Sequence, residues 1–198
     1  MTDPAVVRQA TRRDRATVTA TIAMAFADDP AWRYLLGSHY NDHAPHFASA
    51  LFDGRVEEGT VWLVADGSAV AMWDRPRNEM ASAPSRPDIW DAYADTVGAA
   101  AWSRLEAYES ACTSVKPSTP YWYLGVLATR PERQRRGLAS AVLAPALGLA
   151  DRSGLDCCLE TSSTQNRAYY EARGFTEVTD VPWSGPATWW LRRPALRA

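Results

Sequence analysis

A basic turn that leads into an apolar helical pattern is the stretch of this sequence whose residue types most clearly predict chemistry. Residues 133–136 read Arg-Gln-Arg-Arg, and Gly137 follows where the helical pattern begins. The start of a helix presents unpaired backbone N–H groups and a partial positive charge, and a glycine there lets an anion come close to the backbone. We therefore expect this turn to bind phosphate.

The turn differs from the two commonest phosphate-binding motifs. The sequence contains no Gly-x-x-x-x-Gly-Lys-Ser/Thr, which excludes a P-loop, and no Gly-x-Gly-x-x-Gly followed by an acidic residue. The turn lies instead after residues 121–128, which are nearly all apolar, as in a strand buried on both faces. A helix that Pro145 should kink, a second strand and a second helix follow as far as Phe175.

The segments before this unit must form the scaffold that positions it. Asp14 is expected to cap a helix over 17–27, and Pro30 suits the first position of a short second helix. The apolar spacing over 41–58 predicts an amphipathic helix that Gly59 ends.

A hairpin and two further helices complete the expected scaffold. Asp66-Gly67 indicates a tight turn between strands at 60–65 and 69–73. Residues 74–90 are rich in proline and predict a loop, and the pattern over 89–115 predicts two helices separated near Gly98.

Length and composition restrict the class of protein. The chain has 198 residues, 46% of them hydrophobic, which predicts a single domain over 1–198. A formal net charge of −2 argues against a general nucleic-acid partner. The sequence shows neither a signal peptide nor an apolar stretch long enough to cross a membrane, so we expect a cytoplasmic protein with no membrane partner.

Neither a metal site nor a covalent thiol mechanism is expected. His39, His43 and His46 lack the cysteines or acidic residues at ligand spacing that a metal site would need. Cys157 and Cys158 are neighbours on a predicted strand, which disfavours a disulfide between them, and residues 121–175 contain no histidine to activate a thiolate. Buried, unreactive cysteines are the simpler expectation.

The central unit resembles the GNAT superfamily of N-acetyltransferases. Gln134-x-x-Gly137-x-Ala139, after a strand that ends in Thr129-Arg130-Pro131, is similar to the acetyl-CoA signature of that superfamily. The later segments 159–162 and 166–175, the second with the pattern Asn-x-x-x-Tyr-Glu-x-x-Gly-Phe, match it in the right order. Segments 25–30, 137–142, 159–162 and 185–189 further resemble the members of the superfamily that acetylate puromycin.

The resemblance implies an α/β fold of the GNAT type with acetyl-CoA as cosubstrate. The central sheet should be mixed, covered by helices on both faces, and splayed at the strand that ends near Leu127, so that the pantetheine arm inserts there. The residues that the resemblance assigns to acetyl-CoA are Leu127, Ala128, Thr129, Gln134, Arg135, Arg136, Gly137, Leu138, Ala139, Ser140 and Asn166.

The resemblance implies one proton-transfer residue, and the chemistry of the amine acceptor requires a second. Tyr170 falls on the general-acid position, and a phenol there could protonate the thiolate that leaves, whose pKa is about 8.5. An amine must be neutral before it attacks, and Glu160 at a strand end is the candidate base, directly or through water. Its alternative role is to bind a nearby N–H group or arginine. Tyr169 is a second candidate for the tyrosine that faces the thiol.

The expected acceptor is an amine on a small molecule, possible examples being aminonucleoside antibiotics such as puromycin. The residues expected to bind it are Asp28, Trp32, Tyr34, Trp73, Trp90 and Tyr93, although the same aromatic residues could pack in the core. Alternatives are a protein amine or another metabolite as acceptor, and a sensor that binds acetyl-CoA without turnover. RNA binding by the arginine-rich turn is a third idea, and the acidic net charge counts against it.

Overall fold

A mixed sheet of seven strands forms the centre of the computed structural model, which describes residues 5–76 and 87–196. The strand order is β1-β2-β3-β4-β5-β7-β6, antiparallel throughout except for the parallel pair β4 and β5. The strands are β1 (Val7–Gln9), β2 (Val61–Val64), β3 (Ala69–Asp74), β4 (Tyr121–Thr129), β5 (Asp156–Thr161), β6 (Thr176–Asp180) and β7 (Trp189–Arg193).

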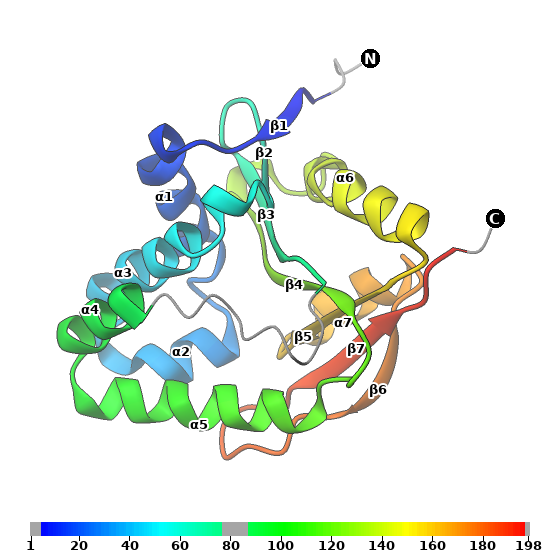
Figure 1. Cartoon of the computed structure of the whole chain (residues 1–198). Coiled ribbons are helices and arrows are strands. Elements are labelled where there is room, and N and C mark those ends of the chain that lie inside the picture. Colours follow the sequence, from blue (N-terminus) through cyan, green and yellow to red (C-terminus); the bar gives the residue numbers. More distant parts are fainter. Residues whose placement is uncertain (1–4, 77–86, 197–198) are drawn as a thin grey trace.

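Helices cover both faces of the sheet. Figure 1 shows the first five gathered on one side: α1 (Arg15–Ala25), α2 (Pro30–Leu36), α3 (Tyr40–Asp53), α4 (Pro87–Val97) and α5 (Ala99–Val115). The other face carries α6 (Leu138–Ser153) and α7 (Thr164–Glu171), whose residues Leu138 and Tyr170 share one apolar cluster with β4 and β5. Each face therefore has its own core, as a layered α/β fold requires.

Several turns occur where the sequence predicts them. The hairpin between β2 and β3 turns at Gly67, whose φ is +69°, and Gly98, with φ +77°, separates α4 from α5. Pro30 is the first residue of α2, where Asp29 caps the helix by accepting a hydrogen bond from the backbone N–H of Trp32 at 3.0 Å. These three predictions are confirmed.

Three predicted boundaries differ from the structure. Asp14 precedes α1 but does not cap it, because its carboxylate binds the Arg8 guanidinium and the Thr11 backbone N–H instead. The helix predicted over 41–58 ends at Asp53, and a separate 3-10 turn covers Val56–Glu58. Most of the loop predicted over 74–90 lies outside the described residues, and α4 already begins at Pro87.

The strand β4 changes the face to which its side chains point. Trp122 and Leu124 pack toward α6, whereas Val126 and Ala128 pack toward α1 and α3. This switch coincides with an irregularity in the pairing with β3, where Gly125 has no partner, and such a bulge re-aims the side chains that follow it. Alternate residues along the whole of β4 are only half-buried, so the prediction of a strand buried on both faces is wrong.

The parallel pair β4 and β5 separates soon after it begins. Its register comprises three partners, of which the last is Tyr123 with Cys158, while β4 continues to Thr129. The splay thus starts four residues before Leu127, the position near which it is expected. Among the described residues, no strand pairs with this edge of β4 beyond Tyr123, so its backbone polar groups are not used by the sheet.

Other sequence expectations concern the cysteines, the proline in α6 and the membrane. Cys112, Cys157 and Cys158 are buried free thiols, and burial raises the pKa of Cys157 to about 12. The helix α6 continues through Pro145 as far as Ser153. Among the helices of the described residues, none is both long and apolar enough to cross a bilayer.

Candidate active site

A cavity of about 620 Å³ opens beside the splayed end of β4. Its walls are the end of α1 and the start of α2 on one side and the start of α6 and the length of α7 on the other, with Leu127 and Thr129 of β4 between them. This volume suits a small organic ligand. The cavity therefore joins the predicted phosphate-binding turn to the predicted catalytic tyrosine.

The turn before α6 has the backbone shape of an anion site. Arg135 and Gly137 both have positive φ angles, +59° and +79°, and such a value is uncommon for a residue with a side chain. A Cβ built on Gly137 meets no atom within 4 Å, so the space above this glycine is open. No side chain caps α6, which leaves the N–H groups of its first turn available to a ligand in the cavity.

The polar side chains of this turn do not all face the cavity. Arg133 lines it and binds Asp66 at 3.1 Å between Nη2 and Oδ2. Gln134 also lines it and donates a 3.4 Å hydrogen bond to the backbone carbonyl of Thr129. Arg136 is exposed and is not among the lining residues, although the sequence predicts a contact with acetyl-CoA for it.

The remaining predicted acetyl-CoA residues divide in the same way. Ala128 is buried against the α1 and α3 side and does not line the cavity. Asn166 lines it from the first turn of α7, a helix that Ser163 caps by accepting a hydrogen bond from the backbone N–H of Asn166. The others that contribute to the walls are Leu127, Thr129, Gln134, Arg135, Gly137, Leu138, Ala139 and Ser140.

Tyr170 reaches the cavity from α7. It is 7% exposed, packs edge to face against Phe175, and its hydroxyl has no hydrogen-bond partner among the described residues. Burial raises the pKa of this phenol well above its ordinary value, and the charges of Glu160 and Asp29 raise it further. Tyr170 is therefore a protonated group in the cavity wall at neutral pH.

The neighbouring Tyr169 is occupied by other contacts. Its hydroxyl lies 3.3 Å from the Ser140 hydroxyl, and the Arg173 guanidinium stacks 3.4 Å above the centre of its ring. Tyr169, Ser140 and Arg173 all line the cavity. Of the two tyrosines, Tyr170 is the one whose hydroxyl is not already engaged.

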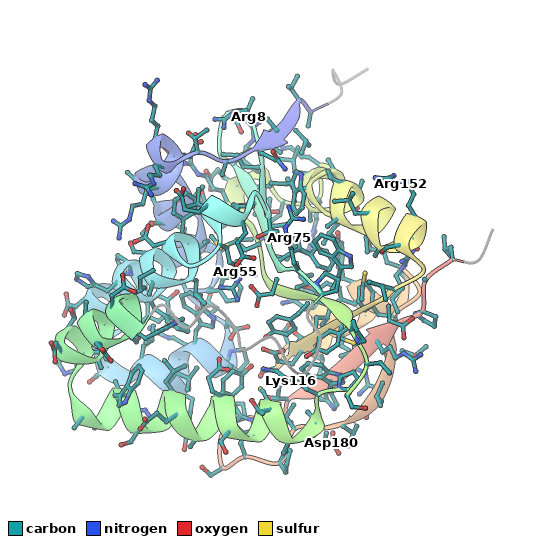
Figure 2. The ribbon with its side chains drawn as sticks, viewed as in Figure 1. Arg8, Arg55, Arg75, Lys116, Arg152 and Asp180 are labelled. Carbon is teal, nitrogen blue, oxygen red and sulfur yellow. The ribbon has the colours of Figure 1, made fainter. Side chains whose placement is uncertain are left out.

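Glu160 lies at the end of β5 among aromatic side chains of the α5 side. Tyr123 donates to its two carboxylate oxygens at 2.6 and 2.8 Å, and Tyr108 of α5 donates to Oε1 at 3.0 Å. Burial raises the pKa of Glu160 to about 7, against the effect of the tyrosine donors. Nearby Glu109 raises it as well, and Lys116, labelled in Figure 2, lowers it. Glu160 is not among the residues that line the cavity.

Most of the aromatic residues expected to bind the acceptor pack in the core. Trp73 has no exposed surface, and Trp32 and Tyr93 are 7% and 5% exposed. Trp90 packs against Tyr93 and Phe47 and is half-buried. The structure thus favours the core alternative for these four residues.

Tyr34 and Asp28 are the two predicted acceptor residues that remain accessible. Tyr34 is 38% exposed and packs edge to face on Trp183, which in turn packs on Tyr108. Asp28 is exposed and lines the cavity beside Asp29. Carboxylates thus lie at the α2 end of the cavity and arginines at the α6 end.

Tyr108, Tyr123 and Trp183 are site residues that the sequence did not single out. They come from α5, β4 and the segment before β7, and they meet only through the tertiary fold. Tyr123 belongs to a strand that reads simply as apolar, so its local pattern holds no signal of a hydrogen bond to Glu160.

His43 and His46 lie in α3, and His39 immediately precedes it. The rings of His39 and His43 lie 5.5 Å apart, and burial lowers the pKa of His43. Within residues 5–76 and 87–196, no three His, Cys, Asp or Glu side chains are grouped so that they could hold a metal ion.

Comparisons with known proteins agree with this arrangement. Residues 28–175 match the model of the acetyltransferase (GNAT) family. An uncharacterised N-acetyltransferase of Schizosaccharomyces pombe is 24% identical over 175 residues, which cover 82% of this chain and 71% of that protein.

Two solved structures illustrate the likeness of fold. A Corynebacterium glutamicum protein described as histone acetyltransferase HPA2 and related acetyltransferase superimposes with a TM-score of 0.68 at 21% identity, covering 98% of each chain. A mosquito arylalkylamine N-acetyltransferase-like protein superimposes with a TM-score of 0.65 at 14% identity, covering 96% of this chain and all of that one.

These matches establish the family and the fold. The mixed seven-stranded sheet with helices on both faces is the GNAT fold, as the sequence predicts. GNAT proteins use acetyl-CoA as their cosubstrate, and the open, uncapped start of α6 is suited to its phosphates. The chain therefore belongs to the GNAT family of N-acetyltransferases.

Proposed function

We propose that this chain transfers the acetyl group of acetyl-CoA directly to the amine of a small molecule, with both substrates bound at once. One observation carries the proposal. Tyr170, whose hydroxyl has no hydrogen-bond partner among the described residues, lines the same cavity as the uncapped start of α6. A proton donor and an anion site in one cavity are what transfer from a thioester with a diphosphate tail requires.

Acetyl-CoA fits the residues of this cavity. Backbone N–H groups of Leu138, Ala139 and Ser140 would hold the pyrophosphate, and Arg135 would add charge. At the unpaired edge of β4 near Leu127 and Thr129, backbone carbonyls would accept hydrogen bonds from the pantetheine amide N–H groups, and a backbone N–H would donate to the acetyl carbonyl. When bound, acetyl-CoA supplies the acetyl group as an activated thioester.

Tyr170 would donate the proton that the departing sulfur needs. Because its raised pKa keeps the phenol protonated at neutral pH, the proton is available whenever the thiolate begins to leave. The absence of a hydrogen-bond partner among the described residues leaves this hydroxyl free to turn toward the sulfur. General-acid catalysis of this kind typically contributes a factor of about 10² to 10⁴.

Glu160 would take the proton of the amine, directly or through water. With a pKa of about 7, its carboxylate is substantially ionised at neutral pH and still basic enough to accept a proton. Tyr108 and Tyr123 orient the carboxylate through their hydrogen bonds. Because Glu160 lies on the α5 side, the amine would approach from there, past Tyr34 and Trp183.

A small amine is the acceptor class that these groups suit. Asp28 and Asp29 give one end of the cavity negative charge, which attracts an ammonium, and aromatic rings lie beside Glu160. Similar folds include an arylalkylamine N-acetyltransferase-like protein and an agmatine N-acetyltransferase, by their descriptions. The more specific form of this proposal is that the acceptor is puromycin. The chain would then be an antibiotic-resistance enzyme.

The test is release of free thiol from acetyl-CoA with a panel of amines. The panel contains an arylalkylamine, agmatine, puromycin and a lysine-containing peptide. Acetylation of any of the small amines supports the proposal, with the product verified by mass. Turnover of the peptide alone would assign a protein amine as acceptor, and tight CoA binding without thiol release from any amine would indicate a sensor.

A further inference from the structure

Arg173 is a cation of the cavity wall that the family resemblance does not assign. We propose that Arg173 binds the pyrophosphate of coenzyme A and closes, from the end of α7, the anion site that the start of α6 opens. This inference rests on the proposed function, because it takes acetyl-CoA as the ligand of the cavity. Arg173 would act by binding and positioning the cosubstrate.

The first support is the position of the Arg173 guanidinium beside the start of α6. Its Nη2 donates to the Ser140 hydroxyl at 2.8 Å, and Ser140 belongs to the first turn of that helix. Stacking on the Tyr169 ring, 3.4 Å from the ring centre, holds the guanidinium in place. The three side chains line the same cavity as Gly137. The Arg173 guanidinium is thus held against Ser140, one of the residues predicted to bind the phosphate.

The second support is the set of hydrogen-bond donors that Arg173 leaves unused. A guanidinium has five N–H donors, and within the described ranges two of them have acceptors, the Ser140 hydroxyl and the Tyr169 backbone carbonyl. No described carboxylate forms an ion pair with Arg173, whereas Arg133 pairs with Asp66 and Arg167 pairs with Glu171. A phosphate with two acceptor oxygens would satisfy the spare donors in the fork geometry that guanidinium groups favour.

A purely structural role explains only part of this geometry. Nη1 donates to the backbone carbonyl of Tyr169 at 2.7 Å, and a cation near the end of a helix is favourable. Capping of α7 therefore accounts for one side of the guanidinium. It does not account for the other side, which reaches across to α6 and faces the cavity.

The experiment measures binding of coenzyme A and of dephospho-coenzyme A by calorimetry to the full chain. The variants are Arg173→Leu and Arg173→Lys, and Arg152→Leu is the matched control for lost charge. Arg152 lies in the last turn of α6, far from the start of that helix, and Figure 2 shows it on the outside of the molecule. Thermal melting of each free variant measures the loss of capping separately.

We expect Arg173→Leu to weaken binding of both ligands by about 10- to 100-fold, since a charge-assisted contact is lost. Arg173→Lys should retain part of the affinity that Arg173→Leu loses. Arg152→Leu should bind both ligands with the wild-type Kd. The slope of log Kd against log salt should be shallower for Arg173→Leu than for the wild type, because one phosphate contact fewer depends on charge. If Arg173 only caps α7, Arg173→Leu would lower the melting temperature without changing that slope.

Two results would overturn the inference. Unchanged affinity of Arg173→Leu for both ligands would make Arg173 a helix cap only, and a loss restricted to coenzyme A would place it at the 3′-phosphate. Neither result bears on acetyl transfer as such. Failure of the wild type to bind coenzyme A would instead refute the proposed function.

Discussion

The Tyr123 hydroxyl of β4 lies within hydrogen-bond distance of both carboxylate oxygens of Glu160 on the adjacent strand, at 2.6 and 2.8 Å. The two residues are side by side because β4 and β5 still pair at Tyr123 and Cys158, just before the strands separate. A donor aimed at the carboxylate favours its charged form and opposes the effect of burial. Tyr123, at the last paired position of β4 and β5, thus favours the charged form of Glu160, the proposed base.

Tyr123→Phe should shift the pH profile of acetyl transfer. Loss of the donor raises the pKa of Glu160 above about 7, so the rise of kcat/KM with pH should move upward by about one unit. Rates measured from pH 5.5 to 9 with a fixed amine test this. Tyr121→Phe is the control, since Tyr121 is also on β4 but packs on Trp190 and has no hydrogen bond to Glu160. Equal profiles for the two variants would remove Glu160 from the base role.

Glu160 should also make the folded state less stable as pH rises. Its folded pKa of about 7 exceeds the ordinary value of 4.5, so the folded protein retains a proton that the unfolded chain releases first. The stabilisation is complete below pH 4.5 and is lost as pH rises through 7, by at most about 3 kcal/mol.

Urea denaturation at pH 5 and pH 8 measures this difference. Relative to the wild type, Glu160→Gln should lose less stability between the two pH values, because it carries no titrating group there. Glu132→Gln removes an exposed carboxylate and serves as control. An identical loss in wild type and Glu160→Gln would show that Glu160 titrates normally.

Tyr170→Phe should reduce turnover while leaving CoA binding nearly intact. Loss of the general acid is expected to lower kcat by about 10²- to 10⁴-fold. CoA binding should change little, because the ring that remains still packs on Phe175. Thiol release gives kcat, and calorimetry gives the Kd for CoA. Tyr169→Phe is the comparison that decides between the neighbouring tyrosines. A larger loss of kcat in Tyr169→Phe would transfer the acid role to Tyr169.

Gly137→Val should weaken CoA binding by filling the open space above the turn. Gly98→Val is the control for backbone strain: both glycines precede a helix, have positive φ angles of +79° and +77°, and have no atom within 4 Å of an added Cβ, while their ψ angles differ, 0° at Gly137 and 163° at Gly98. Each variant should lose on the order of 1 to 3 kcal/mol of stability through backbone strain. Only Gly137→Val should change the Kd for CoA, measured by calorimetry. Equal affinity in both variants would argue against phosphate at this turn.

Local chemistry explains why much of the fold could be predicted from the sequence. Asp66-Gly67 needs nothing beyond its own residues to form a hairpin, and Gly98 and Gly137 mark helix starts through their backbone freedom. The same holds for Pro30 at the start of α2. At these positions the backbone preference of one or two residues was enough, and the predictions were confirmed.

Predictions that depend on which other side chains a residue meets were less successful. Asp14 has the right type and spacing for a helix cap, but the Arg8 guanidinium competes for its carboxylate and wins. The partners of Glu160 come from 37 and 52 residues away, and no local pattern points to them. Trp73 suits an aromatic pocket by type, yet its place in the middle of the sheet buries it entirely.

The separation of β4 from β5 has a consequence for how the sheet exchanges with water. Between Leu124 and Thr129, every second backbone amide of β4 faces the gap, and no strand in the described part of the chain lies beside it to slow its hydrogen exchange. In the free enzyme these amide protons should exchange with deuterium faster than their neighbours, which bond to β3. A pantetheine arm lying in the gap would act as a temporary eighth strand, and the deuterium uptake of this short segment would report its arrival and departure.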